Sequence, residues 1–153
     1  MKKTLSVILA ALMLLLLAGC AEADKEEPRV EQPLFGTILA DDAFLAAKEK
    51  MTADSITGLQ FYVANATEVF LEDPAEILNI WNLLEKISVG NATEEPQIDD
   101  GLVVFDFIFR DGSDYTVSFM TSEYVYGDRS VYEVNNPDSV LAAMNEARNA
   151  VKE

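Results

Sequence analysis

The amino-acid sequence predicts an α+β fold in two layers, with a mostly antiparallel sheet and two helices on one of its faces. Three features indicate this fold. Short runs of alternating apolar and polar residues indicate strands, turn residues join neighbouring runs, and two amphipathic segments each begin with Asp or Asn followed by Pro. The resulting order, β-β-α-β-β-β-α, favours strands that pair with their sequence neighbours under a layer of helices.

Two β-hairpins are predicted from the alternation. In the first, the pattern runs over 59–63, breaks at 64–66 and resumes over 67–71. In the second, Asp111 and Gly112 form a tight turn between the alternating runs 103–109 and 115–119. Because side chains alternate between the faces of a strand, the core should receive Phe105, Phe107 and Phe109. The opposite, solvent-facing set should be Val104, Asp106 and Ile108.

Helices are predicted behind two caps. Asp73 stands at an N-cap position, Pro74 follows at the first helical position, and Glu76 completes a capping box. The apolar stripe behind this cap places Trp81 in the core and comprises Ile77, Ile80, Trp81, Leu84 and Ile87. Asn136 and Pro137 open the second helix, whose apolar residues are Val140, Met144, Ala147 and Val151. A shorter helix is predicted over 41–51, with Phe44, Ala47 and Met51 on one side.

The remaining segments are predicted as a loop and a pair of short strands. Residues 88–100 contain Gly90, Pro96 and acidic residues without periodicity, which indicates a loop of about a dozen residues, longer than the usual ~4–6. A long loop is a possible site. Two short β-prone pieces are predicted within 123–134, around Gly127.

The first twenty residues have the layout of an export signal. Lys2 and Lys3 precede an uncharged, mostly apolar run over 5–17, and small residues come before Cys20. This run is shorter than the ~20 residues that a membrane-spanning helix needs. The four residues Leu17-Ala18-Gly19-Cys20 resemble the lipobox of bacterial lipoproteins. The resemblance implies that Cys20 is lipidated, becomes the first residue of the mature chain and anchors it to the extracytoplasmic face of the cell membrane.

The chain therefore divides into three predicted parts: a lipoprotein signal peptide (1–19), an acidic flexible tether (20–40) and a single α+β domain (41–153). The tether begins AEADKEEPRVEQP, a polar and acidic sequence that lacks the apolar residues needed for a core. Cys20 is the only cysteine, so no disulfide can form and the domain must be stable through its core alone.

The central segment, over about 55–150, resembles small uncharacterised domains found on lipoproteins of Gram-positive bacteria. The resemblance is carried by the D-P-A-E helix opening at 73–76, Trp81 in the apolar stripe, and the strand of alternating aromatics that ends at Asp111 and Gly112. These are features of the fold, and the resemblance implies no active residues.

Composition excludes several classes of function. The chain of 153 residues has a formal net charge of −16, which argues against binding to nucleic acid, whose phosphates require Lys and Arg. It has no histidine, so Ser/His/Asp, Cys/His and histidine-based zinc sites are excluded. The acidic turns at 99–101 and 111–114 lack the ligand spacing of a calcium loop, and we predict no metal and no cofactor.

The candidate binding residues surround the turn after the second hairpin. Tyr124, Tyr126 and Tyr132 lie close in sequence to Arg129, a basic residue in a very acidic chain. Tyrosine has an apolar ring and a polar tip, which suits a recognition patch as well as packing at a sheet edge. Both interpretations remain open from the sequence.

These observations predict a non-catalytic binding or interaction module for an envelope protein, held at the membrane through lipidated Cys20. The alternative is a module that binds a small molecule or cation at the cell surface. A hydrolase with paired carboxylates ranks third, since that chemistry needs no histidine.

Overall fold

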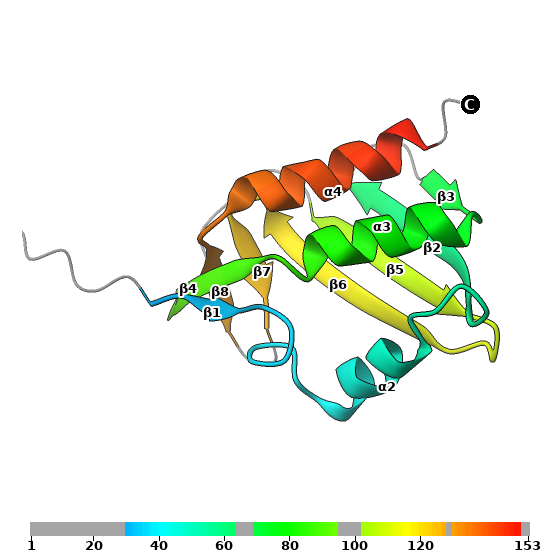
Figure 1. Cartoon of the computed structure of the whole chain (residues 1–153). Helices are drawn as coiled ribbons and strands as arrows, with labels where there is room; N and C mark the ends of the chain where they lie inside the picture. Colours follow the sequence, from blue (N-terminus) through cyan, green and yellow to red (C-terminus); the bar gives the residue numbers. More distant parts are fainter. Residues whose placement is uncertain (1–29, 64–68, 95–101, 128–129, 151–153) are drawn as a thin grey trace, which may run out of the picture.

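The fold is described from a computed structural model, over residues 30–63, 69–94, 102–127 and 130–150. Within these residues it has one eight-stranded sheet and three helices, which confirms the α+β class (Figure 1). The strands are β1 (Gln32–Pro33), β2 (Ile56–Val63), β3 (Val69–Leu71), β4 (Ser88–Thr93), β5 (Val103–Phe109), β6 (Asp114–Thr121), β7 (Tyr124–Tyr126) and β8 (Val131–Val134). The helices are α2 (Asp42–Lys50), α3 (Pro74–Leu84) and α4 (Pro137–Asn149).

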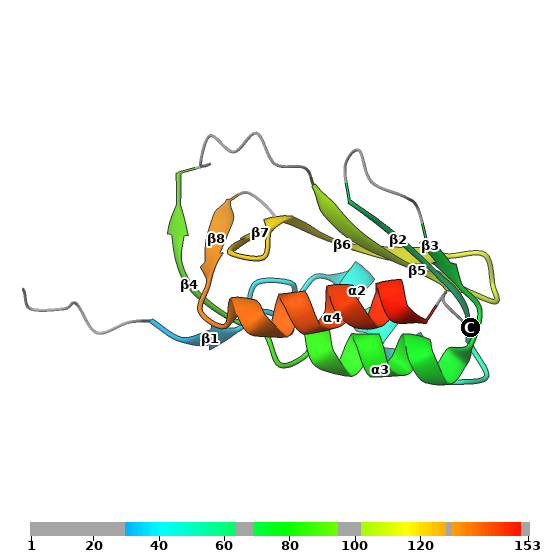
Figure 2. The same cartoon turned by 90° about the horizontal axis from the view of Figure 1, so that it is seen from above.

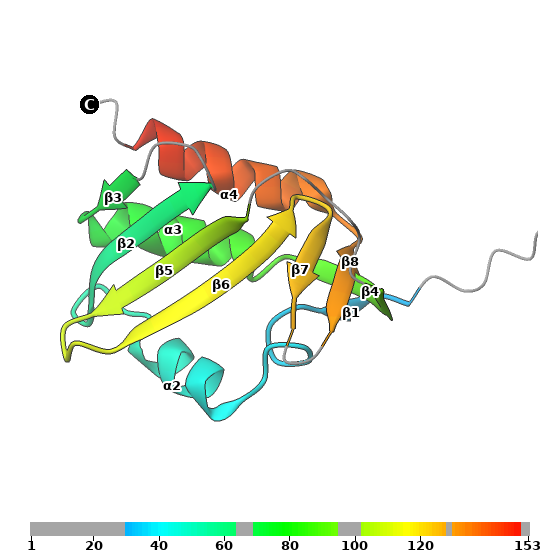
Figure 3. The same cartoon turned by 180° about the vertical axis from the view of Figure 1, so that it is seen from behind.

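Every pair of neighbouring strands is antiparallel, in the order β1-β4-β8-β7-β6-β5-β2-β3. The helices α3 and α4 lie side by side on one face of the sheet, and the view from behind shows the sheet in front of them (Figures 1 and 3). Register shifts in β2, β4 and β6 mark bulges, which bend and twist a sheet. Seen from above, β4 and β8 are turned strongly away from β5 and β6 (Figure 2).

Both predicted hairpins are present. The turn of the second has Gly112 at φ +81°, a conformation that glycine adopts without steric cost. The Phe109 N–H donates to the carbonyl of Ser113 at 2.9 Å and closes the turn. Phe105, Phe107 and Phe109 are buried against the helices, as the alternation predicts. Val104 is also buried, although it was expected to face solvent, so the second face of the sheet carries apolar residues too.

The three helices begin where their caps predict. The Asp73 carboxylate accepts from the N–H of Ala75 at 2.8 Å, and Asp41 accepts from the N–H of Phe44 at 2.8 Å. Asn136 is the N-cap residue of α4, but its side chain reaches the connection before β4. Its Oδ1 accepts from the Ser88 N–H and its Nδ2 donates to the Lys86 carbonyl, each at 2.9 Å, so the side chain ties the start of α4 to the end of the α3 segment.

An aromatic cluster forms the centre of the core. The Trp81 ring stacks on Phe35 at 4.7 Å between centroids and meets Phe107 edge-on at 5.2 Å. Phe44 of α2 stacks on Phe35 at 5.2 Å and lies 6.2 Å from Tyr115 of β6. The predicted short helix therefore packs on the same face of the sheet as the other two, which makes three helices there instead of the two predicted.

The prediction of a loop over 88–100 is wrong for its first half. Residues 88–93 form β4, which lies between β1 and β8 in the sheet. The pattern was missed because Val89 and Gly90 are both buried whereas 91–93 are exposed, so the strand has no period-two alternation. Its pairing with β8 joins residues far apart in the sequence, and a local pattern carries no signal of such pairing. Residues 95–100 lie outside the described residues.

The predicted boundary between tether and domain, at residues 40 and 41, is too late in the chain. Gln32 and Pro33 form β1, which pairs with β4, and Leu34 and Phe35 are buried in the core. The Leu34 N–H donates to the Ile87 carbonyl at 2.9 Å. The polar sequence before Leu34 conceals this boundary, because the strand is only two residues long and is held by the apolar pair that follows it.

We expect Leu34→Ala to lower the free energy of unfolding by about 2–5 kcal/mol, because Leu34 is fully buried and its truncation leaves a cavity. Denaturation in urea would measure the loss. The matched control is Val30→Ala at an exposed position, which should stay within about 0.5 kcal/mol of the parent chain. If both variants lower the free energy of unfolding equally little, residues 30–40 belong to the tether and not to the domain.

Candidate functional site

The strongest candidate site is the face of the sheet that carries no helix, which we call the open face (Figure 3). Strand alternation and the cross-strand registers assign its residues, since their neighbours along each strand are buried beneath the helices. The open face comprises Gln60, Tyr62, Val104, Asp106, Ile108, Asp114, Thr116, Ser118, Met120, Tyr124, Tyr126, Val131 and Glu133.

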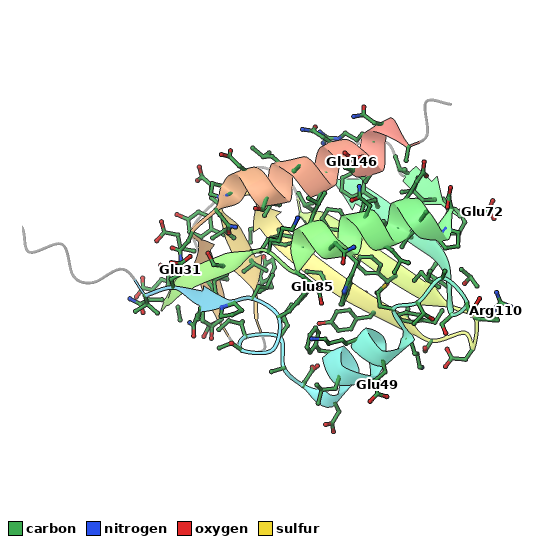
Figure 4. All side chains as sticks on the ribbon, viewed as in Figure 1. Glu31, Glu49, Glu72, Glu85, Arg110 and Glu146 are labelled. Atoms are coloured by element: carbon green, nitrogen blue, oxygen red, sulfur yellow. The ribbon has the colours of Figure 1, made fainter. Side chains whose placement is uncertain are left out.

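The open face carries acidic side chains and no basic ones. Its residues include three acids, Asp106, Asp114 and Glu133, and no Lys or Arg. Asp106 accepts a hydrogen bond from the Thr116 hydroxyl at 2.8 Å, across the β5–β6 pair. Many other acidic side chains lie on the helices and connections, as Glu49, Glu85 and Glu146 illustrate (Figure 4). Most acidic residues of the described part of the chain therefore lie away from this face.

Tyr124 and Tyr126 lie on the open face because they flank Val125 on β7. The Val125 side chain is fully buried in the core beneath the helices, so its two neighbours must point the other way. Both tyrosines are half-buried. Tyr126 faces Val131 of β8 in the register, which places a half-buried aromatic side chain beside a buried β-branched one on the open face.

The structure does not bring the three predicted tyrosines together. Tyr132 pairs with Val125 across β7 and β8, so its ring lies on the helix side and packs against the core. It also lies against Gly127, where a Cβ would come within 2.6 Å of the Tyr132 ring. The prediction of one patch is wrong for Tyr132, which fits the alternative of packing near a turn. Arg129 and Cys20 lie outside the described residues.

Other residues of the open face were not singled out from the sequence. Tyr62, Val104 and Met120 are half-buried or buried there, and Val104 and Met120 stand outside the main core cluster. Phe70 of β3 is 51% exposed, and its ring covers Gly58, where a Cβ would come within 2.7 Å of it. The signal was present in the second hairpin, where apolar Val104 and Ile108 occupy positions that solvent-facing strands usually give to polar residues.

A groove of about 360 Å³ lies at the edge of β6, beyond the point where β7 ends. Its walls are Thr116, Val117 and Ser118 of β6, Tyr126 and Gly127 after β7, and the segment 38–41. Asp41 is the charged residue of this lining. The groove therefore joins one predicted tyrosine to an incompletely paired strand.

Two ionisable groups near this end of the sheet have shifted pKa values. Burial raises the pKa of Tyr115 above its usual value, and the negative charge of Asp41 raises it further. The pKa of Asp111 lies below its usual range, because its carboxylate accepts a hydrogen bond from Lys50 and others from Ser113. The Lys50 Nζ lies 2.6 Å from Asp111 Oδ2. Asp111 is thus engaged in the turn, as expected from turn chemistry.

The described residues contain no group of three or more His, Cys, Asp or Glu side chains placed to hold a metal ion. The acidic turn at 99–101 lies outside them. In the same part of the chain, no helix has the length and apolar character needed to cross a membrane.

The fold and the open face together define a single-sheet antiparallel α+β domain in which one face of the sheet carries no helix. In comparisons with known proteins, the chain matches no family model, no curated protein and no solved structure.

We expect the stability of the domain to fall as the pH rises above about 10, partly through Tyr115. The unfolded chain loses the tyrosine proton near pH 10, whereas burial keeps Tyr115 neutral in the folded state to a higher pH. Below pH 10 this group contributes no pH dependence. Urea unfolding of the parent chain and of Tyr115→Phe, from pH 7 to 11.5, should show a constant difference up to pH 9. Above pH 10 the variant should lose less stability, and parallel curves would contradict the assignment.

Proposed function

We propose that the protein is a membrane-anchored extracytoplasmic lipoprotein whose domain binds an envelope protein without performing chemistry. The proposal takes the anchor from the resemblance of residues 17–20 to a lipobox and from the use of the only cysteine there. Residues 21–31 would link Cys20 to β1. Even fully extended at ~3.3–3.6 Å per residue, such a link would hold β1 within about 40 Å of the membrane.

The observation that supports binding is the composition of the open face. Protein interfaces are depleted in charged residues at their centre and enriched in Tyr, Phe and Met. The open face has the aromatic part of that pattern in half-buried Tyr62, Tyr124 and Tyr126, and the exposed ring of Phe70 extends it to the edge strand β3. A partner docked on this face would bury the exposed parts of these rings.

A small-molecule module is the alternative, and the groove at the edge of β6 favours it. Its volume of about 360 Å³ lies in the range of ligand sites, roughly 300–1,000 Å³. Its lining offers Asp41, Thr116 and Ser118 as polar groups. However, a small ligand is held best in an enclosed site, and this groove is open to solvent along the sheet edge. We therefore rank a protein partner first.

The first test of the proposal is the anchor. Cys20→Ala should block lipidation and leave a longer precursor that no longer partitions into detergent, because the thioether cannot form. Gly19→Ala is the matched control, since it keeps a small residue before the cysteine and should mature normally. Fatty-acid labelling and the mass of the chain measure both outcomes. Normal acylation of the Cys20→Ala chain would show that Cys20 is not the lipidated residue.

The second test concerns the open face. The double variant Tyr124→Ala/Tyr126→Ala should lose most of the partner that crosslinks to the parent protein on intact cells, because two aromatic contacts of the interface are removed. Its stability should fall by much less than the ~3–5 kcal/mol expected for Phe107→Ala in the core. Thermal unfolding of the purified domain provides that comparison.

The matched control for this test lies on the helices. Leu45 of α2 and Leu141 of α4 are 52% and 42% exposed, so Leu45→Ala/Leu141→Ala also removes two large exposed side chains. This control should retain the crosslinked partner. Loss of crosslinking in the control alone would move the site to the helices, and a tyrosine variant that unfolds would assign both rings to packing.

A further inference from the structure

One edge of β6 is left without a strand partner in the middle of the sheet. β7 pairs with β6 only at Phe119 and Thr121, and within the described residues no other strand pairs with that edge. The other edge of β6 is paired with β5 along 114–119. The first half of β6 is therefore an edge strand, although the sheet continues through β7 and β8 beyond it.

The register shows which backbone groups point into the gap. Phe109 donates to the Ser113 carbonyl, so these residues form the hydrogen-bonded pair nearest the turn. Bonded and non-bonded pairs alternate along an antiparallel ladder. The pairs of β5 with Tyr115 and Val117 are consequently bonded, whereas Thr116 lies opposite Asp106 in a non-bonded pair. The N–H and C=O of Thr116 therefore point away from β5, toward the groove that Thr116 lines.

The far wall of the groove leaves these groups available. Residues 38–41 form that wall, but the backbone groups of Ile38 and Leu39 bond back to Leu34 and Gly36, and the Asp41 carbonyl accepts from the N–H of Leu45 in α2. None of the backbone bonds found in the described residues joins 38–41 to β6. The wall also shields the edge, because an unprotected strand edge invites uncontrolled pairing with other chains. The backbone groups of Thr116 that face the groove therefore have no strand partner among the described residues.

We propose that this groove binds an extended basic peptide segment, which adds to the free edge of β6 as a short antiparallel or parallel strand. The inference deepens the proposed function by assigning the groove to a segment of the bound envelope protein. A strand added at an edge gains affinity through main-chain hydrogen bonds and specificity through alternate side chains.

The chemistry of the segment follows from the groove. Thr116 offers one donor and one acceptor, which an extended backbone can match. Ile38 and Tyr126 provide apolar contacts, and Asp41 is the charge in the lining, within a chain of net charge −16. Lys or Arg side chains on the segment would be attracted by this charge, whereas an acidic segment would be repelled.

The test uses the purified protein and the probe peptide Lys-Val-Thr-Val-Lys-Val-Lys, capped at both ends. Backbone amide shifts should appear at Thr116, Ser118 and residues 38–41, and a counterpart with Glu in place of Lys should bind at least tenfold more weakly. Shifts confined to open-face residues outside the groove, such as Tyr62 and Val104, or to the α3–α4 surface would overturn the assignment, as would absence of binding at millimolar peptide.

A pair of variants isolates the backbone bond. Thr116→Pro removes the N–H that points into the groove without removing a bond to β5, and Thr116→Val keeps this N–H. Both lose the hydroxyl bond to Asp106, so that loss cancels in the comparison. We expect Thr116→Pro to bind the peptide about tenfold more weakly than Thr116→Val. Equal binding by two folded variants would overturn strand addition.

Two methylated peptides keep the test decisive if Thr116→Pro does not fold. One carries N-methyl groups at the second, fourth and sixth residues, and the other at the third and fifth. Because only alternate N–H groups of an added strand face β6, one peptide should lose binding and the other retain it. Equal behaviour of the two would overturn the proposal and leave a small-molecule pocket. Crosslinking on intact cells separates this proposal from the proposed function. If the crosslinked partner is lost in Tyr124→Ala/Tyr126→Ala but retained in Thr116→Pro, strand addition is wrong and the proposed function stands.

Discussion

The packing of one indole ring connects most of this fold. Trp81 of α3 stacks on Phe35 from the N-terminal segment and meets Phe107 of β5 edge-on, while Phe44 brings α2 to the same place and Tyr115 brings β6. Aromatic pairs at these separations contribute about 0.5–1.5 kcal/mol each beyond the area they bury. Because the rings come from five separate segments, the helix layer and the first residues of the domain are fixed on the sheet by a shared contact. This arrangement gathers the large apolar side chains on one face and leaves the other to β-branched, tyrosine and polar residues.

The parts of the fold that could be predicted are those in which local pattern and tertiary environment agree. The hairpin around Gly112 has its turn chemistry and its alternation in one stretch of sequence, and the helix behind Asp73 has a cap followed by a regular stripe. β1 and β4 could not be found in this way. Each is stabilised by pairing with a strand distant in sequence, and in β4 the burial of Val89 and Gly90 followed by three exposed residues gives no period of two.

The candidate site was predicted less completely than the fold. Closeness in sequence around a turn suggested one tyrosine patch, but strand geometry places Tyr126 and Tyr132 on opposite faces of the sheet. Tyr126 follows Val125 along β7 and points to the opposite face, whereas Tyr132 is the cross-strand partner of Val125 and points to the same face. The free edge of β6 could not have been predicted at all. It depends on where β7 ends, and the sequence of β6 carries no information about the length of the neighbouring strand. Sites made by missing pairing become visible only when the whole strand order is known.

The position of β1 at the end of the sheet has a mechanical consequence. For a chain held at Cys20, tension would enter the domain at Val30, whose carbonyl accepts from the Asn135 side chain, and would pass along the two residues of β1. A strand of two residues offers little resistance to tension. The tension would next reach Leu34 and Phe35, whose side chains are buried in the core. The ring of Phe35 would then slide from the indole of α3 while β5 and β6 stayed paired. Under such a load the domain would yield first at β1 and the segment that follows it, while the rest of the sheet stayed intact.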